Sequence, residues 1–190
     1  MDETRVRAVG RETAALQQAF CDQQAAAVVA AGRRIAGALR SGRKLLAFGN
    51  GGSAADAQHF AAELVGRYLL DRPGLAALAL TTDPSVLTSV GNDLGFEQVF
   101  RRQVEAHGQP GDVAFGITTS GRSPNVLSAL ELARERGLVT MALTGAGGVA
   151  LAGKVDQLLA VPSGDTPRVQ EVHGLVVHLL CELVEEECAP

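Results

Sequence analysis

The sequence predicts an α/β protein: a single three-layer αβα domain with a five-stranded parallel sheet, preceded by N-terminal helices. Short runs rich in Val, Leu and Ala alternate along the chain with segments of helical spacing. The runs are apolar throughout, which is typical of parallel strands that are covered on both faces. The 190 residues, of which 46% are apolar, are enough for one sizeable core. We therefore expect residues 1–190 to form one domain.

An N-terminal helical region, residues 1–41, precedes the first predicted strand. Helical spacing runs through Thr4–Leu39, where Leu16, Phe20 and Ile35 belong to one apolar stripe, and we expect two helices here. So long a leading region cannot bury its apolar stripe on the sheet alone. We therefore expect part of it to lie at the interface of a homo-oligomer.

Five apolar runs are the predicted strands, and helices or turns connect them. The runs are Leu45–Phe48, Leu75–Leu80, Asp112–Thr118, Leu138–Leu143 and Gln157–Val161. The later helices are expected to begin at Ser53, Pro84, Phe96, Pro124 and Pro167, with a short one inside the glycine-rich segment 145–153. Pro84 follows Asp83, and a capping residue before a first-turn proline is typical of a helix start.

A glycine-rich turn, Gly49–Ser53, follows the first predicted strand and leads into an alanine-rich helix. Glycines let the backbone approach a ligand closely, and the first turn of a helix presents free N–H groups that favour an anion. Ordinary turn chemistry explains the same residues equally well. His59 and Glu63 lie four residues apart on this helix and face the same way. They are either a solvated pair or an acid–base or metal-binding pair beside an anion cradle.

A second anion cradle is predicted after the third strand. Thr118, Thr119, Ser120 and Ser123 lead into the helix at Pro124. Capping this helix needs only one hydroxyl, so the others favour phosphate binding over capping alone. No lysine of the Walker type follows, which argues against nucleotide triphosphate hydrolysis. Because ligands bind at the carboxyl ends of parallel strands, both cradles are expected at one edge of the sheet.

Five further polar residues are candidates whose roles the pattern leaves open. Asn92 and Asp93 are expected in a loop, where turn chemistry accounts for them. His173 is expected to be a core or interface residue of the last helix. Gln170 and His178, two turns apart on that helix, can reach a site at the sheet edge or a neighbouring subunit's site.

Composition excludes several classes of function. A formal net charge of −4, with one tyrosine and no tryptophan, argues against nucleic-acid binding. The sequence shows neither an apolar run long enough to cross a bilayer nor a signal-peptide pattern, so no membrane association and a cytoplasmic location are expected. The three cysteines form no Cys-x-x-Cys pair and are expected to be reduced.

Five blocks, in order along nearly the whole chain, resemble the sugar isomerase (SIS) domain family, and within it the phosphoheptose isomerases. The blocks are Gly49–Ser53, Asp56–Glu63, Val90–Asp93, Gly116–Ser123 and Thr166–His173, with His178 beyond. The resemblance implies a flavodoxin-like SIS fold. It also implies a homotetramer with sites shared between subunits, and a phosphorylated seven-carbon sugar as the substrate.

The resemblance also assigns roles residue by residue. It implies that the sugar is bound by Asn50, Gly51, Gly52, Asn92 and Asp93, with Ser53, Glu63 and Gln170 also at the substrate. It implies that the phosphate is held by Thr118, Thr119, Ser120 and Ser123. It makes Glu63 and His178 the catalytic pair. It implies one Zn²⁺ per subunit, held by His59, Glu63, Gln170 and His178. In one departure, Pro167 stands where some members have aspartate, for which Asp165 is a candidate substitute.

The expected activity is that of an aldose–ketose isomerase. It would convert sedoheptulose 7-phosphate to D-glycero-D-manno-heptose 7-phosphate through an enediol(ate), with Glu63 and His178 as the acid–base pair. An alternative is a noncatalytic binding protein that resembles the DnaA initiator-associating protein, and a third possibility is a phosphosugar-sensing domain. The resemblance implies that the noncatalytic relative lacks the glutamate at the position of Glu63, which this chain keeps.

Overall fold

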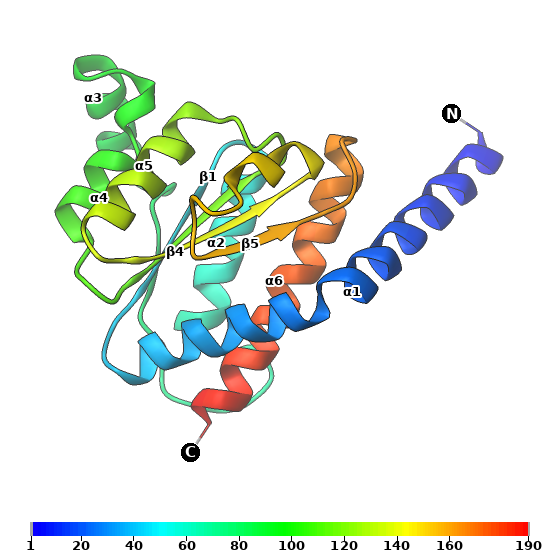
Figure 1. Ribbon diagram of the computed structural model, residues 1–190, viewed down its shortest axis with the longest axis horizontal. Coiled ribbons are helices and arrows are strands. Elements are labelled where there is room, and N and C mark those ends of the chain that lie inside the picture. Colours follow the sequence, from blue (N-terminus) through cyan, green and yellow to red (C-terminus); the bar gives the residue numbers. More distant parts are fainter. Residues whose placement is uncertain (1, 190) are drawn as a thin grey trace.

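A computed structural model describes residues 2–189 of the chain. The strands are β1 (Leu45–Gly49), β2 (Ala77–Ala79), β3 (Val113–Thr118), β4 (Val139–Thr144) and β5 (Gln157–Ala160). They form one sheet in the order β2-β1-β3-β4-β5, and every neighbouring pair is parallel (Figure 1). The predicted five-stranded parallel sheet is thereby confirmed.

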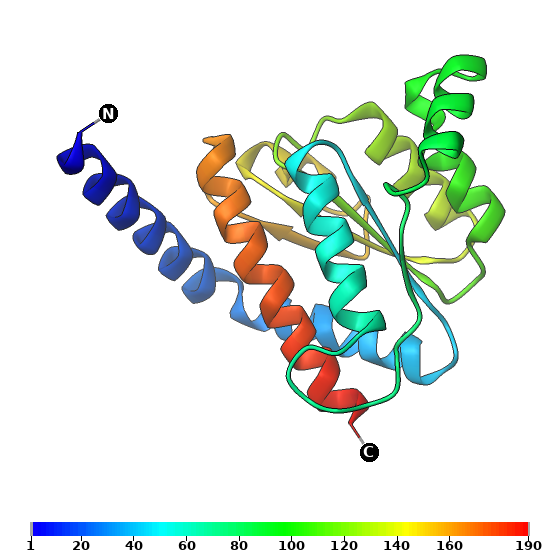
Figure 2. The ribbon, with the colours of Figure 1, turned by 180° about the vertical axis from the view of Figure 1, so that it is seen from behind.

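Helices cover both faces of the sheet. They are α1 (Glu3–Arg40), α2 (Gly52–Val65), α3 (Pro84–Asp93), α4 (Arg101–His107), α5 (Pro124–Glu135) and α6 (Thr166–Cys188), with short 3₁₀ helices η1 (Phe96–Gln98) and η2 (Ala146–Leu151). One face is covered by α2, α6 and the second half of α1 (Figure 2). The other is covered by α4 and α5, with α3 at its margin (Figure 1).

One hydrophobic core lies on each side of the sheet, and β1 contributes to both. Leu45 and Ala47 belong to the core beneath α1, α2 and α6, whereas Leu46 and Phe48 belong to the core beneath α4 and α5. Successive side chains of a strand point to opposite faces, so a strand that is covered on both sides must be apolar at every position. This explains why the strands appear in the sequence as unbroken apolar runs.

The N-terminal region forms one continuous helix, α1, so the expectation of two helices is wrong. Gly10, Gly32 and Gly37 interrupt its sequence, but each glycine costs a helix only about 1 kcal/mol and does not end it. The second half of α1 buries Phe20 and Ile35 against the core and packs along α6. The first half projects beyond the sheet (Figures 1 and 2).

A second correction concerns Asn92 and Asp93, which lie in the last turn of α3 and not in a loop. The Asp83 side chain accepts a hydrogen bond from the Val86 N–H and starts this helix, which continues through Gly91. The helix expected from Phe96 is also divided into η1 and α4. The other predicted elements agree in type, and the edge strand β2 is shorter than expected.

The sheet has a topological switch point between its adjacent strands β1 and β3. The chain leaves β1 into α2 on one face of the sheet and leaves β3 into α5 on the other face. This strand order is flavodoxin-like, and a crevice for ligands opens where two such connections diverge. Among residues 2–189, no helix has both the length and the apolar character needed to span a membrane.

Candidate active site

The turn after β1 opens α2 without a side-chain cap. Gly51 is the N-cap residue, with a φ of 57°, and no side chain bonds the first N–H groups of the helix. A Cβ at Gly49 would lie 2.7 Å from the Ile117 carbonyl oxygen, so only glycine fits there. Ser53 is buried inside the first helical turn. The N–H groups of Ser53 and Ala54 donate to the carbonyl oxygens of Asn50 and Gly51, so the anion that we expect here would be bound by the N–H groups that precede Ser53.

The loop after β3 gathers the predicted hydroxyl groups. The hydroxyls of Thr118 and Ser123 are 2.9 Å apart, and the Ser120 hydroxyl accepts a hydrogen bond of 3.1 Å from the Arg122 N–H. Ser123 is the N-cap residue of α5, but its side chain makes no capping bond. Its hydroxyl instead faces Thr118, so it is not used to cap the first turn of α5.

Packing against η2 fixes the shape of this loop. Gly121 has a φ of 66°, and a Cβ there would overlap Gly148. The Gly145 N–H donates to the Thr119 carbonyl oxygen at 3.0 Å. The first contact requires glycine at position 121, and the second is a backbone hydrogen bond. The loop that carries the hydroxyl groups therefore has little freedom to rearrange.

A pair of asparagines joins the two helix starts across the switch point. Each of Asn50 and Asn125 donates its amide N–H to the other's amide oxygen at 2.8 Å, and the Val126 N–H also donates to Asn125. Asn125 is only 2% exposed. Sequence reasoning predicted Asn50 but missed Asn125, because the role of Asn125 depends on a contact 75 residues away.

Two small hollows lie beside this asparagine pair. One of about 230 Å³ is lined by Asn50, Phe96, Glu97, Ser123, Pro124 and Asn125. One of about 140 Å³ is lined by Gly49, Asn50, Gly51, Ala54, Thr81, Leu87, Phe96 and Phe100. Asn50 and Phe96 belong to both, so the hollows adjoin. Asn92 and Asp93 line neither hollow: they are exposed, and the Asn92 amide donates to the Asp93 carboxylate at 2.7 Å.

The predicted acid–base residues meet where α2 and α6 lie side by side (Figure 2). His59 Nε2 lies 3.2 Å from Glu63 Oε1, and the centres of the His59 and His178 rings are 4.9 Å apart in an edge-to-face arrangement. Tyr68, which sequence reasoning missed, stacks on His178 with the centres of the two rings 5.7 Å apart. The structure thus brings three of the four predicted metal ligands together.

Gln170 lies towards the glycine turn at the start of α6. A Cβ at Gly52 would overlap the Gln170 amide, so this side chain rests directly on the turn. Gln170 therefore connects the helix that carries His178 with the open start of α2. Its amide lies against Gly52, whereas His59, Glu63 and His178 lie further along α2 and α6.

Known proteins share both this sequence and this fold. The SIS domain family model matches residues 10–145. The phosphoheptose isomerase of Bradyrhizobium sp. strain BTAi1 is 56% identical over 180 residues, which cover 93% of this chain and 90% of that protein. The chain belongs to the phosphoheptose isomerase family.

Solved structures of the family agree with the fold. A phosphoheptose isomerase from Neisseria gonorrhoeae superposes with a TM-score of 0.91 at 44% identity, covering 97% of this chain and 98% of the other. One from Francisella tularensis gives a TM-score of 0.93 at 36% identity, covering 98% and 100%. Membership in the phosphoheptose isomerase family confirms the recognition made from the five sequence blocks. It makes the protein an enzyme, a sugar phosphate isomerase, and not a noncatalytic binding protein.

The predicted zinc ligands fit the metal by their chemistry. Imidazole nitrogens and carboxylate oxygens are ordinary zinc ligands, and His59, Glu63 and His178 are neighbours. Within the described residues 2–189, however, no three His, Cys, Asp or Glu side chains are already grouped as in a formed metal site. Rotation of these side chains is needed before they converge on one ion.

Asp56, one turn before His59, is a further polar residue to which sequence reasoning assigned no role. Its Oδ2 atom is buried and has no hydrogen-bond partner within residues 2–189. Burial raises the pKa of Asp56 to about 6, against a smaller opposing effect of His59. The carboxyl group of Asp56 therefore takes up a proton at a higher pH than an exposed aspartate does.

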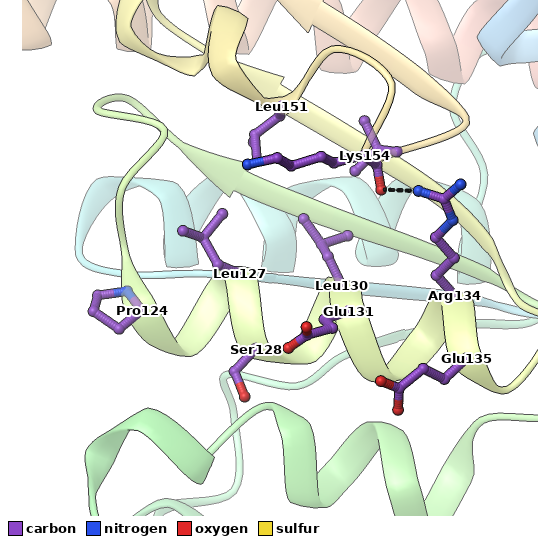
Figure 3. A pocket seen from close by; sticks show the side chains of 10 residues that line it. Pro124, Leu127, Ser128, Leu130, Glu131, Arg134, Glu135, Leu151 and Lys154 are labelled. Carbon is purple, nitrogen blue, oxygen red and sulfur yellow. Dashed lines mark hydrogen bonds between the residues drawn. The ribbon is translucent and has the colours of Figure 1, made fainter.

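A wider groove lies away from all these residues, on the outer side of α5. Figure 3 shows this groove of about 760 Å³ between α5 and the segment 151–155. Leu127, Leu130 and Leu151 form its floor, and Arg134 donates to the Lys154 carbonyl oxygen at 3.1 Å. It contains none of the predicted site residues and plays no part in the candidate site.

Proposed function

We propose that the protein converts sedoheptulose 7-phosphate to D-glycero-D-manno-heptose 7-phosphate by moving the carbonyl group from C2 to C1. A base removes a proton from C1 of the ketose, and the electron pair forms an enediolate with its charge on the C2 oxygen. A proton is then returned to C2. The proton of the O1 hydroxyl is transferred to the oxygen on C2, which leaves the carbonyl at C1. Each step needs an acid–base group close to the C1–C2 bond.

The observation that carries this proposal is that Glu63 and His178 both contact His59, where α2 and α6 lie side by side. The Glu63 side chain is 26% exposed and bonded to His59, so its carboxylate is held in place but remains accessible. His178 lies on the neighbouring helix α6, with its ring against that of His59. Together they supply a carboxylate and an imidazole, and we assign the two carbon-bound proton transfers to this pair.

The phosphate is proposed to lie at the start of α5. The hydroxyls of Thr118, Ser120 and Ser123 lie close together in the loop that leads into this helix, and the side chain of its N-cap residue makes no capping bond. Thr119 is part of the same loop. Anion binding at an uncapped helix start needs no lysine or arginine. Asn50, Gly51 and Gly52 then lie between the phosphate and the acid–base pair, where the sugar hydroxyls would be bound.

His59, Glu63, Gln170 and His178 are the residues that would hold a Zn²⁺ ion. When bound, the metal would polarise the substrate carbonyl as a Lewis acid and stabilise the enediolate. Glu63 would then serve both as a ligand and in proton transfer. Without the metal, the uncharged Gln170 amide is the hydrogen-bonding group that lies against the glycine turn.

We further propose a homotetramer in which neighbouring subunits complete each site. Half of α1 projects from the body, and Val65 and Leu69 are 53% and 62% exposed next to the α2–α6 cluster. Exposed apolar side chains next to a site are typical of a surface that another subunit covers. Asn92 and Asp93, which are separate from the site in one chain, would approach a site only through such an assembly or through movement of α3.

The test is an isomerase assay with sedoheptulose 7-phosphate on the wild type, Glu63→Gln and His178→Gln, each with and without added Zn²⁺. Glutamine keeps the shape of glutamate but cannot accept a proton. Each variant is expected to lose at least about a hundredfold in rate, the lower end for an acid–base group. The double variant should be little slower than either single one, because the two groups act as a unit.

Two outcomes contradict the proposal in different ways. Full activity of Glu63→Gln would remove the acid–base assignment while leaving the substrate in place. A wild type that is inactive on sedoheptulose 7-phosphate with and without zinc, but active on another phosphorylated ketose, would change the substrate and keep the chemistry. A matched control is Glu131→Gln on the outer face of α5, which is expected to leave the rate unchanged.

A further inference from the structure

We propose that Tyr68 is a positioning residue that holds the His178 ring in its reactive orientation, and that the buried Arg72–Glu185 pair fixes the loop that carries Tyr68. This inference rests on the proposed function of His178. It concerns the segment between α2 and β2, for which the sequence predicted no role.

The His178 ring is held by aromatic contacts. The Tyr68 ring stacks on it with centres 5.7 Å apart and an angle of 30° between the ring planes, and the His59 ring lies 4.9 Å from it at an angle of 87°. Among residues 2–189, no hydrogen bond holds the His178 imidazole. A side chain on an exposed helix face otherwise samples several rotamers. Of the two rings that contact His178, Tyr68 has the larger flat surface, and we infer that it restricts the His178 rotamer.

Glu185 anchors the backbone of the Tyr68 loop. Its carboxylate accepts hydrogen bonds from the N–H groups of Tyr68, Leu69 and Leu70 at 3.0, 2.7 and 2.8 Å. Glu185 is only 1% exposed. Burial alone would raise the pKa of Glu185, but these three N–H groups and Arg72 outweigh it, and the pKa is lowered. The carboxylate is thus kept charged, as three donors require.

Arg72 connects the same loop to the end of α2. Its Nε lies 3.0 Å from Glu185 Oε1, and its two terminal nitrogens donate to the carbonyl oxygens of Glu63 and Leu64, each at 2.9 Å. Both charged side chains are almost fully buried. A buried ion pair adds little to stability, because desolvation offsets the attraction, whereas its geometry is strictly defined. This pair therefore sets where Tyr68 lies relative to Glu63 and His178.

Tyr68 presents an uncharged ring to His178. Burial and the neighbouring Glu182 carboxylate raise the pKa of Tyr68, so its hydroxyl stays protonated. The contribution to His178 comes from the ring face, which phenylalanine shares and leucine lacks. If Tyr68 only filled space in the core, a leucine of similar volume would serve as well. The two substitutions therefore separate positioning from packing.

The experiment measures kcat and KM with sedoheptulose 7-phosphate for the wild type, Tyr68→Phe, Tyr68→Leu, His178→Gln and the Tyr68→Leu/His178→Gln double variant. Tyr68→Leu should lower kcat by roughly three- to tenfold, the value of one aromatic contact, with KM within about twofold. Tyr68→Phe should keep kcat within about twofold. In the His178→Gln background, Tyr68→Leu should have no further effect, because the ring that it positions is gone.

Proton NMR of the imidazole signals provides a measurement that does not depend on turnover. The ring current of Tyr68 should shift the His178 signals, which are identified by their loss in His178→Gln. Tyr68→Phe should keep the shift and Tyr68→Leu should abolish it. A well-dispersed spectrum also shows that each variant is folded.

Each contrary result points to a different failure. If Tyr68→Leu keeps wild-type kcat and His178→Gln is inactive, the positioning role is wrong and the proposed function stands. An equal loss in Tyr68→Phe and Tyr68→Leu, or a further loss in the His178→Gln background, would also overturn positioning through the ring. If His178→Gln is as active as the wild type, the acid–base assignment fails, and the role of Tyr68 fails with it.

Discussion

His173 shows what burial does to a single titratable residue. It is fully buried on α6, and neither ring nitrogen has a hydrogen-bond partner within residues 2–189. Burial lowers the pKa of His173 from 6.5 to about 4, against a smaller opposing effect of the Thr144 backbone. The sequence prediction that His173 is a core residue is confirmed.

This burial predicts a loss of stability in mild acid. Between pH 6.5 and 4, the unfolded chain binds a proton at His173 and the folded chain does not, so stability falls as the pH falls. At pH 5 the loss relative to pH 7.5 is about 2 kcal/mol from this residue. His173→Phe should lack that part of the loss in urea unfolding experiments at the two pH values. His107→Phe, at an exposed site, is the control, and an identical pH dependence in all three proteins would contradict the prediction.

The sequence predicted those site residues whose chemistry is visible locally. The i, i+4 spacing of His59 and Glu63 and the hydroxyls after Gly116 needed no knowledge of the fold. Asn125 and Tyr68 could not be found in this way, because each acts through a partner more than 70 residues distant in the chain. Periodicity reports which face a residue occupies and not what that face meets.

At the scale of elements, the starts of α2 and α5 are the features that we propose to bind anions. Both helices begin without a side-chain cap, and they flank the switch point from opposite faces of the sheet. Glycines let α2 begin this way. In α5 the capping serine is drawn towards Thr118 instead.

Replacing Ser120 and Ser123 together by alanine should therefore raise KM by about tenfold or more and change kcat much less. Hydrogen bonds to a charged phosphate are worth about 1.5–3 kcal/mol each, and contacts remote from the reacting carbons stabilise the ground and transition states equally. Steady-state kinetics would show the split. Ser128→Ala, further along the same helix, is the matched control. An unchanged KM in the double variant would remove the phosphate assignment.

Element types were predictable from the sequence, whereas element ends were less so. The apolar runs gave all five strands because both faces of the sheet are covered. The division of the N-terminal region into two helices and the placement of Asn92 and Asp93 in a loop were wrong, because α1 is continuous and α3 extends to Asp93. Both helices are continuous through their glycines, Gly91 in α3 and the three glycines of α1. Once a helix has formed, each further residue adds a backbone hydrogen bond, so a single glycine does not end it.

At the scale of the whole molecule, α1 has two parts with different tasks. Its second half completes the core with Phe20, Val28 and Ile35 along α6. Its first half extends past the sheet, joined to α6 by a hydrogen bond of 2.5 Å from the Thr13 hydroxyl to Glu171 (Figure 2). The first half is therefore the part that is free to contact another subunit.

Deleting residues 2–12 should accordingly lower the oligomeric mass without unfolding the chain. The deletion removes a mostly exposed stretch, in which Ala8 and Val9 are half-buried, whereas a deletion up to Gly42 would also remove core residues and confuse assembly with folding. Light scattering gives the mass, and circular dichroism shows that the remaining helices persist. An unchanged mass would mean that the projecting half-helix is not interfacial.

The Asn50–Asn125 pair has a consequence for how a ligand is received. Its two amide hydrogen bonds join the loop after β1 to the start of α5 before any substrate arrives. The two helix starts, which we propose to bind anions, are thus preorganised relative to each other, and their ordering entropy is lost during folding and not during binding. A short, highly polar sugar phosphate offers little apolar surface to drive its own binding. A crevice that needs no rearrangement leaves more of its interaction energy for the reacting end.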